Sequence, residues 1–223
     1  NQADFSTAIK FLNALIKSGI LVHQATADFS IGEKRYPKGS YLVKTAQAFR
    51  PHVLDMFEPQ DHPNDFLYPG GPPIRPYDAA GWTLAYQMGV KVDRVLEAFD
   101  GPFEAIPYGQ LLEPAPASLP TSSSGYFLDA RVNDSFKVVN DLLKAKVKVY
   151  RTQVPTKAVP AGSFYVPSSG KKALELAVKS HGVVPKVAEG VPSGAKEIFP
   201  ARIGLYDYYG GSMPSGWARW IME

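Results

Sequence analysis

An internal repeat constrains the fold of this chain more than any other feature of its sequence. The segment FLNALIKSGILVH at 11–23 aligns with VVNDLLKAKVKVY at 138–150, with Asn, Leu, Lys and Val at matching positions. Further along, YPKGSYLV at 36–43 aligns with VPAGSFYV at 159–166, with Pro, Gly, Ser and Val in common. Order, spacing and turn motif agree together, which favours a duplication over a chance likeness of two ordinary αβ segments.

Each copy of the repeat predicts the same order of elements: helix, strand, loop or hairpin, strand, helix. The first strands are expected at 20–26 and 147–153, which alternate and are rich in β-branched residues. The closing helices are expected at 45–58 and 169–183, and the second should end at Gly182 as at a helix C-cap. We therefore predict an α/β fold of duplicated helix-strand-strand-helix units, forming either one mixed sheet or two small α/β sub-domains.

The Pro-x-Gly-Ser segment predicts the turn before the second strand of each copy. Pro37 and Pro160 set φ for this turn, and Gly39 and Gly162 supply its conformationally permissive position. The aromatic residue and the valine that follow should then enter the strand.

The N-terminal segment predicts an amphipathic helix that begins almost at once. Asp4 or Ser6 can cap it. Its buried stripe is expected to consist of Ile9, Leu12, Leu15 and Ile16.

The rest of the chain predicts connectors and a change of domain. A helix is expected around 82–88 and strands at 92–99 and 201–209, with a short helix at 215–223. Both ends are expected to be cut from a longer polypeptide. The predicted division is a first α/β unit with a Pro/Gly-rich insertion at 1–112, a linker rich in Pro, Ser and Ala at 113–125, a second α/β unit at 126–200, and the start of a further domain at 201–223.

Composition excludes several classes of function. The net charge of +3 comes from scattered basic residues, which argues against a nucleic-acid partner. The absence of cysteine excludes disulfides, thiolate metal sites and a cysteine nucleophile. No apolar stretch approaches the roughly 20 residues that a membrane span needs.

The histidines give only weak signals for chemistry. His52 with Asp55, and His62 with Asp65, have an H-x-x-D spacing that could place two metal ligands on one helical face. Solvated side chains are the favoured interpretation, and His23 fits a structural place in a strand. The chain has no G-x-S-x-G, G-x-G-x-x-G, P-loop or H-E-x-x-H motif. We therefore predict no catalytic residue, no metal ligand and no cofactor here; a small hydrolase would have to use His52 and Asp55.

The stretch YPGGPPIRPYDAAGWTLAYQMGV at 68–90 supplies the candidate ligand-binding residues Arg75, Tyr77 and Trp82, because aromatic faces and a guanidinium in a rigid loop lose little entropy on binding. In the favoured alternative, the prolines hold an extended segment against the domain and Asp78 caps the following helix. Its apolar side chains would then fill a core: Trp82, Leu84, Tyr86 and Met88.

Three segments carry a resemblance to a known family. They are similar to the region that follows the catalytic domain in exported bacterial proteins related to the M14 zinc carboxypeptidases. The three segments are YPKGSYLVKTAQAFRPHVLDMFEPQ, the 68–90 stretch, and ARIGLYDYYGGSMPSGWARWIME. In that group this region leads into a class I glutamine-amidotransferase-like domain. The segment ARIGLYDYY resembles the first strand of that domain. The resemblance covers nearly the whole chain.

The resemblance implies an accessory role. Family members bind zinc through an H-x-x-E pair, but the third positions after the histidines here are Thr26, Asp55, Asp65 and Val184, so no zinc ligand carries over. The zinc of such a parent lies in its peptidase domain, and the parent is periplasmic or secreted. We expect a non-catalytic region that supports the peptidase or guides its substrate, with neighbouring domains of the same polypeptide as partners. A binding module for cell-wall peptide or glycan is the alternative.

Overall fold

The computed structural model describes residues 2–61, 63–75, 83–114 and 117–223. The elements of the first half are α1 (Phe5–Lys17), β1 (His23–Ala25), β2 (Phe29–Ile31), β3 (Lys34–Tyr36), β4 (Tyr41–Leu42), α2 (Arg50–Phe57), α3 (Leu84–Gln87) and β5 (Phe103–Ala105). Those of the second half are β6 (Gly125–Leu128), α4 (Asp134–Lys144), β7 (Val149–Arg151), β8 (Phe164–Pro167), the 3-10 helix η1 (Ser168–Gly170), α5 (Lys171–His181), β9 (Lys186–Val187), β10 (Lys196–Ile198) and α6 (Met213–Met222).

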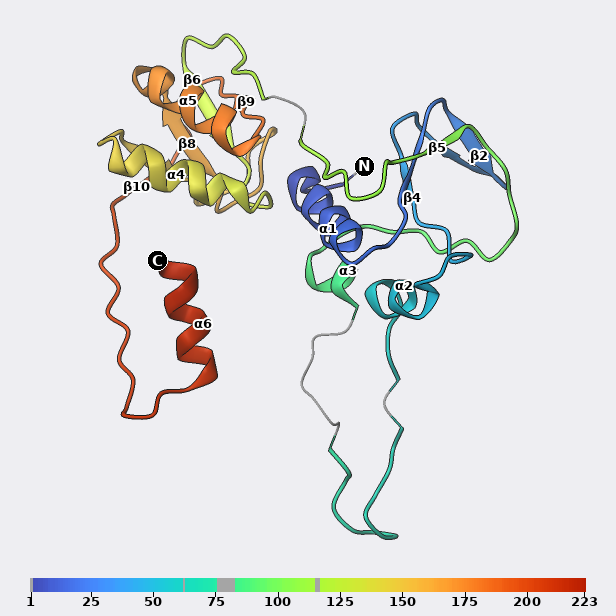
Figure 1. Cartoon of the computed structure of the whole chain (residues 1–223). Helices are drawn as coiled ribbons and strands as arrows, with labels where there is room; N and C mark the ends of the chain where they lie inside the picture. Colours follow the sequence, from blue (N-terminus) through green and yellow to red (C-terminus); the bar gives the residue numbers. More distant parts are fainter. Residues whose placement is uncertain (1, 62, 76–82, 115–116) are drawn as a thin grey trace.

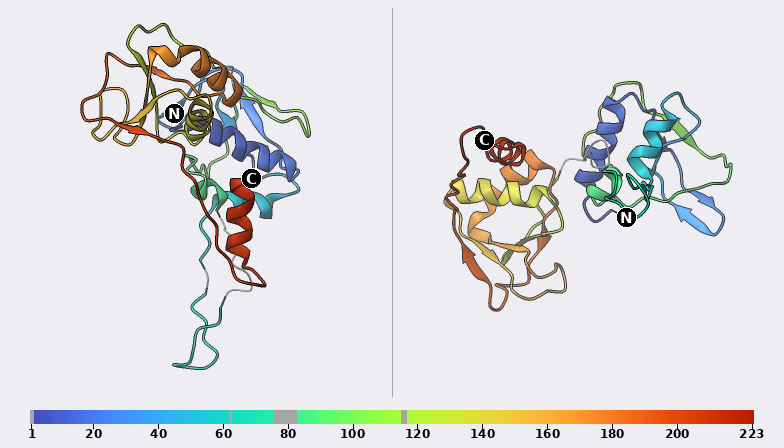
Figure 2. Two further views of the ribbon diagram at one scale, coloured as in Figure 1. Left: turned by 90° about the vertical axis from the view of Figure 1, so that its left-hand side faces the viewer. Right: turned by 90° about the horizontal axis from the view of Figure 1, so that it is seen from below.

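The predicted α/β class is confirmed, with helices packed on small antiparallel sheets (Figure 1). The first half holds a three-stranded sheet of order β4-β1-β5 and the β2-β3 hairpin, and the second half holds a five-stranded sheet of order β10-β7-β8-β6-β9. Figure 2 shows the halves as two lobes. We call them the first and the second unit.

The sheets show the duplication in their register. His23 lies opposite Leu42 in the first unit, and Tyr150 lies opposite Tyr165 in the second. In the sequence alignment, His23 is equivalent to Tyr150 and Leu42 is equivalent to Tyr165. β5 and β10 lie on the same side of β1 and β7, so the repeat continues beyond the aligned segments.

The predicted turns are also confirmed. The amide of Gly39 donates to the carbonyl of Ala25 over 2.8 Å, and the amide of Gly162 donates to the carbonyl of Thr152 over 2.8 Å. Both glycines have positive φ, +85° and +82°, where a side chain would be strained. The Pro-x-Gly-Ser motif therefore makes the same turn twice.

Each unit has its own apolar core. α1 buries Ile9, Leu12, Leu15 and Ile16 as predicted, and Asp4 caps it by accepting from the amide of Thr7 over 3.0 Å. The other core members of the first unit are Phe11, Ile20, Val22, Val53 and Ala85. The core of the second unit lies between its sheet and α4 and α5, and includes Tyr126, Leu128, Val138, Leu142, Val166, Leu174 and Val178.

The two units touch where α1 meets the start of α4. Lys10 Nζ lies 2.7 Å from Asp134 Oδ1. The amide of Asn133 donates to Asp4 Oδ2 over 2.8 Å, and its side-chain amide donates to Thr7 Oγ1 over 3.1 Å. Polar contacts thus join the two cores.

Two predicted strands are wrong, because residues 92–99 and 201–209 form none. Side-chain ion pairs hold the first segment: Asp93 with Lys34 at 2.6 Å, and Arg94 with Glu58 at 2.8 Å. The strand that follows is β5 instead. The second segment is exposed along its length and pairs with no strand among the described residues.

The predicted helices fared better. Residues 169–183 contain α5, which ends at Gly182 with φ +66° as expected, and 215–223 coincide with most of α6. The helix expected at 45–58 is shorter, since α2 starts at Arg50. Gln47, which precedes α2, does not join the helix. Its side-chain oxygen accepts a hydrogen bond from the backbone amide of Leu21 over 2.8 Å.

Candidate functional site

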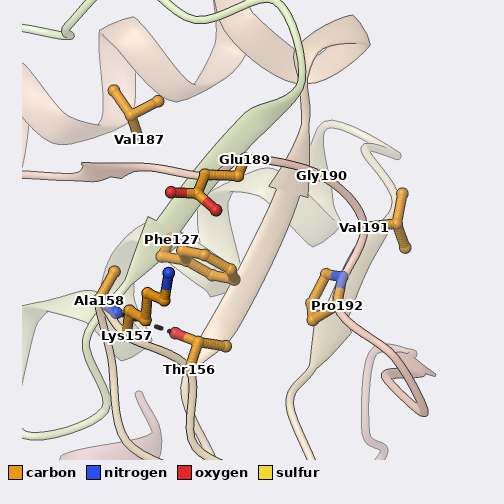
Figure 3. Close-up of a pocket in the computed structure, with 9 residues that line it drawn as sticks. All are labelled: Phe127, Thr156, Lys157, Ala158, Val187, Glu189, Gly190, Val191 and Pro192. Carbon is orange, nitrogen blue, oxygen red and sulfur yellow. Dashed lines mark hydrogen bonds between the residues drawn. The ribbon is translucent and has the colours of Figure 1, made fainter.

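A hollow of about 420 Å³ lies on the second unit, on the far side of its sheet from α4 and α5 (Figure 3). It is a shallow depression, open to solvent on one side. Its walls come from the loop between β7 and β8 and from the segment after β9. The lining residues are Phe127, Thr156, Lys157, Ala158, Val187, Glu189, Gly190, Val191 and Pro192.

Strand alternation places Phe127 at this hollow. Its neighbours Tyr126 and Leu128 point into the helix-covered core, so Phe127 points to the opposite face. There its ring packs against Tyr165 with centroids 5.9 Å apart, in a small cluster that also buries Val159. Three successive apolar residues form this part of β6 and all are buried, so no alternation in the sequence indicated which face Phe127 takes.

Hydrogen bonds of Thr156 shape the loop that forms one wall. Its hydroxyl accepts from the amides of Ala158 and Val159 over 3.2 and 3.0 Å, and its own amide donates to the carbonyl of Val159 over 2.8 Å. These bonds hold the loop in one conformation and set the position of Lys157.

A charged group anchors the same wall from behind. Lys186 Nζ donates to the carbonyl of Ala158 over 2.8 Å and lies 3.2 Å from Asp129 Oδ2. The guanidinium of Arg131 also binds Asp129, at 2.7 Å. These bonds, chiefly those from Arg131, lower the pKa of Asp129 to about 2 against the opposing effect of burial. The Asp129 carboxyl is thus ionised at neutral pH.

The hollow carries one side chain of each charge. The side chains of Lys157 and Glu189 approach Phe127 from opposite sides (Figure 3). An ammonium and a carboxylate beside an apolar surface can together bind a ligand with polar groups, although Phe127 itself is only 5% exposed. The sequence interpretation did not identify this site.

The residues proposed from the sequence as ligand-binding lie elsewhere. Arg75 is exposed on the returning stretch of a projecting arm, whereas Tyr77 and Trp82, with the expected cap Asp78, lie outside the described residues. The convergence of the three side chains therefore stays a prediction.

The described part of that arm, residues 63–75, projects from the first unit as two antiparallel stretches (Figure 1). The amide of Ile74 donates to the carbonyl of Asp65 over 2.9 Å, and that of Leu67 donates to the carbonyl of Pro72 over 3.1 Å. Its large apolar side chains are exposed: Phe66, Leu67, Tyr68 and Ile74. The prolines of this part do not hold the chain against the domain.

The helix after the arm packs only in part as expected. Leu84 and Met88 contact the first core, but Tyr86 is exposed, so its predicted place in a core is wrong. Thr83 precedes the first residue of α3, and its hydroxyl donates to the carbonyl of Glu58 over 2.7 Å, which fixes α3 to the end of α2.

The described histidines show structural surroundings. His52 lies on α2 with Asp55, whose carboxylate accepts from the side chain of Gln60 over 3.1 Å. His23 lies on β1, where burial and then Lys44 lower its pKa. His181 bonds Asp141 across α5 and α4 at 2.8 Å. Within the described ranges, no group of three or more His, Asp or Glu side chains could hold a metal ion.

A second exposed feature is the C-terminal segment 199–222. Ser212 caps α6 by accepting from the amide of Ser215 over 3.2 Å, yet α6 buries none of its residues. Trp217 and Trp220 stack edge to face with ring centroids 5.9 Å apart. The exposed large apolar side chains are Phe199, Ile203, Leu205, Tyr206, Tyr208, Tyr209, Met213, Trp217, Trp220, Ile221 and Met222.

Comparison of the chain with protein-family models, with curated proteins and with solved structures finds no match. In the part of the chain that the structure describes, no helix is long and apolar enough to cross a membrane.

Proposed function

We propose that this chain is a non-catalytic accessory region of an M14-like zinc metallocarboxypeptidase and packs against a neighbouring domain of the same polypeptide. The observation that supports this function most is the uncovered apolar surface of segment 199–222. Contiguous exposed apolar surface of this kind is typical of a protein contact. The sequence resemblance supplies the identity of the neighbour, an amidotransferase-like domain.

The energetics of α6 point the same way. Helices this short are marginal in water unless they bury an apolar face. Trp217 and Trp220 are 60% and 71% exposed, although tryptophan is among the residues that contribute most to binding when covered. A neighbouring domain that covers these rings would stabilise both the helix and the contact.

Hydrogen exchange of segment 213–222 tests this function. We expect fast exchange in the 223-residue chain and slow exchange in the longer polypeptide that includes the following domain. Replacement of both Trp217 and Trp220 by Ala should remove the protection in the longer polypeptide, whereas Tyr108→Ala, an exposed aromatic of the first unit, should not. Equal exchange in both chains would contradict the proposal, and protection that grows with the concentration of the short chain would indicate self-association instead.

The hollow beside Phe127 supports a second function, a binding module for cell-wall peptide or glycan. Such ligands combine charged or hydroxyl groups with apolar faces, which Lys157, Glu189 and the apolar surface beside them can meet. The two functions are compatible in one exported protein whose zinc lies in a separate peptidase domain. Titration of the labelled chain with a muropeptide should shift the amides of residues 156–158 and 187–191, and Lys157→Ala with Glu189→Ala should abolish the shifts.

A further inference from the structure

The duplication reveals an incomplete sheet edge in the first unit. β4 corresponds to β8, and in the second unit the outer side of β8 is covered by β6 over the whole of Gly125–Leu128. In the first unit, no strand of the described residues pairs with the outer side of β4. The equivalent place is therefore open.

The backbone groups on that edge are determined by the ladder. The amide of Ala25 donates to the carbonyl of Ser40 over 2.8 Å, and His23 lies opposite Leu42, so Ser40 and Leu42 face β1. In an antiparallel ladder the intervening residues face the other way. Tyr41 and Val43 thus direct their N–H and C=O groups outward, where the described chain offers no strand.

The second unit shows what such groups bind. The equivalents of Tyr41 and Val43 are Phe164 and Val166, which pair with Leu128 and Tyr126 of β6. Phe164 and Val166 are buried, whereas Tyr41 and Val43 are only half-buried. The side chains of Tyr41 and Val43, at the edge of the first core, are therefore partly exposed.

The edge carries some protection against added strands, because β4 is only two residues long and Lys44 follows Val43, but its pairing positions carry less than those of β5. Exposed edges are usually protected by charges, prolines or bulges. The other edge of the same sheet, β5, carries Glu104 and follows Pro102, but Tyr41, Leu42 and Val43 are all uncharged. The open edge is the one suited to accept a strand.

We propose that β4 binds an extended apolar peptide segment as an added antiparallel strand, with large apolar residues at the two positions that correspond to Tyr126 and Leu128. This binding site is separate from the surface of segment 199–222 and from the hollow. Backbone hydrogen bonds would supply affinity, and the alternating apolar side chains would supply specificity, as in other sheet-extending peptide complexes.

A synthetic peptide with the sequence SSSGYFLDAR, residues 122–131, is the probe, and a scrambled peptide is its control. At saturating peptide we expect amide exchange of Tyr41 and Val43 to slow by about tenfold or more, with no change at Ala105 on the opposite edge. Unchanged exchange at Tyr41 and Val43, or slowing confined to strands β8 and β9, would overturn the proposal.

Two edge variants add an independent test. Val43→Pro removes the outward amide and should abolish peptide binding, while Ala105→Pro removes the matching outward amide of β5 and should leave it intact. If Val43→Pro does not fold, the exchange result on the unmodified chain decides. Slow exchange of Tyr41 and Val43 without peptide, increasing with protein concentration, would assign the edge to a second copy of the chain and contradict the proposal.

Discussion

The two units share a backbone scheme but differ in what surrounds it. Both have the same helix, the same Pro-x-Gly-Ser turn and the same register between their paired strands. The second unit adds β6 and β9 on the outer side of β8, whereas the first unit adds the β2-β3 hairpin and the projecting arm. The hydrogen-bonded frame is thus the common part, and the cover of the frame is where the copies diverge.

The equivalent core leucines should give the largest effect. Leu15 and Leu142 occupy matching helix positions and both are 0% exposed. We expect Leu142→Ala to lower the free energy of unfolding by about 3 to 4 kcal/mol, and Leu15→Ala by about 2 to 3 kcal/mol because the open sheet of the first unit can relax around the cavity. Urea unfolding measures both. A larger loss for Leu15→Ala would break the comparison.

Acid should destabilise the second unit through Asp129. Its folded pKa of about 2 lies below the ordinary value of 3.8 that it has in the unfolded chain, so its stabilisation is full well above pH 3.8 and is lost as the pH falls toward 2. The difference corresponds to about 2 kcal/mol. Asp129→Asn should remove this part of the pH dependence in unfolding followed between pH 2 and 6, and Asp100→Asn, an exposed carboxylate of the first unit, should not.

The contact between the units should contribute less. Burial of Asp134 opposes its ionisation, but the ion pairs with Lys10 and Lys137 lower its pKa. Lys10→Met leaves Lys137 in place, so we expect a loss of about 1 kcal/mol in the free energy of unfolding. In calorimetry, the unfolding temperatures of the two units should then differ more than in the unchanged chain. Lys17→Met, at an exposed end of α1, is the control and should leave the transitions unchanged.

The smallest effect concerns the ends of α1 and α4. Gly19 has φ +86°, and its counterpart Lys146 has φ +58°, a conformation that favours glycine. We expect Lys146→Gly to raise the free energy of unfolding by about 0.5 kcal/mol, because relief of strain exceeds the added freedom of the unfolded chain. Lys144→Gly, at the last residue of α4, should lower it instead. A loss for both variants would contradict the equivalence of the two helix ends.

The sequence predicted features that depend on neighbouring residues in the chain. The repeat, the turns at Gly39 and Gly162, and the buried stripe of α1 rest on periodicity and local backbone preference. The strand expected at 92–99 does not form, because contacts with residues distant in the sequence hold this segment. Asp93 pairs with Lys34, and Arg94 pairs with Glu58.

The candidate site was less predictable for the same reason. The hollow brings Phe127 together with residues near 157 and 189, which are far apart in the sequence. No local sequence motif predicts that these residues are close in space. The aromatic residues of the 68–90 stretch attracted attention because they are close in sequence, yet its described part projects as an arm. The apolar run at 126–128 does not alternate with polar residues, so it indicated neither the face of Phe127 nor its partners.

Amide hydrogen exchange on the uniformly labelled 223-residue chain tests the comparison of the two units most directly. The amides of Ala25, Thr152, Gly39 and Gly162 should all be protected, because each donates to the backbone of its own turn. On the outer edges, those of Phe164 and Val166 should be protected and those of Tyr41 and Val43 should exchange fast. Loss of protection at Ala25 and Gly39 alone, or equal protection at both outer edges in dilute protein, would contradict the account.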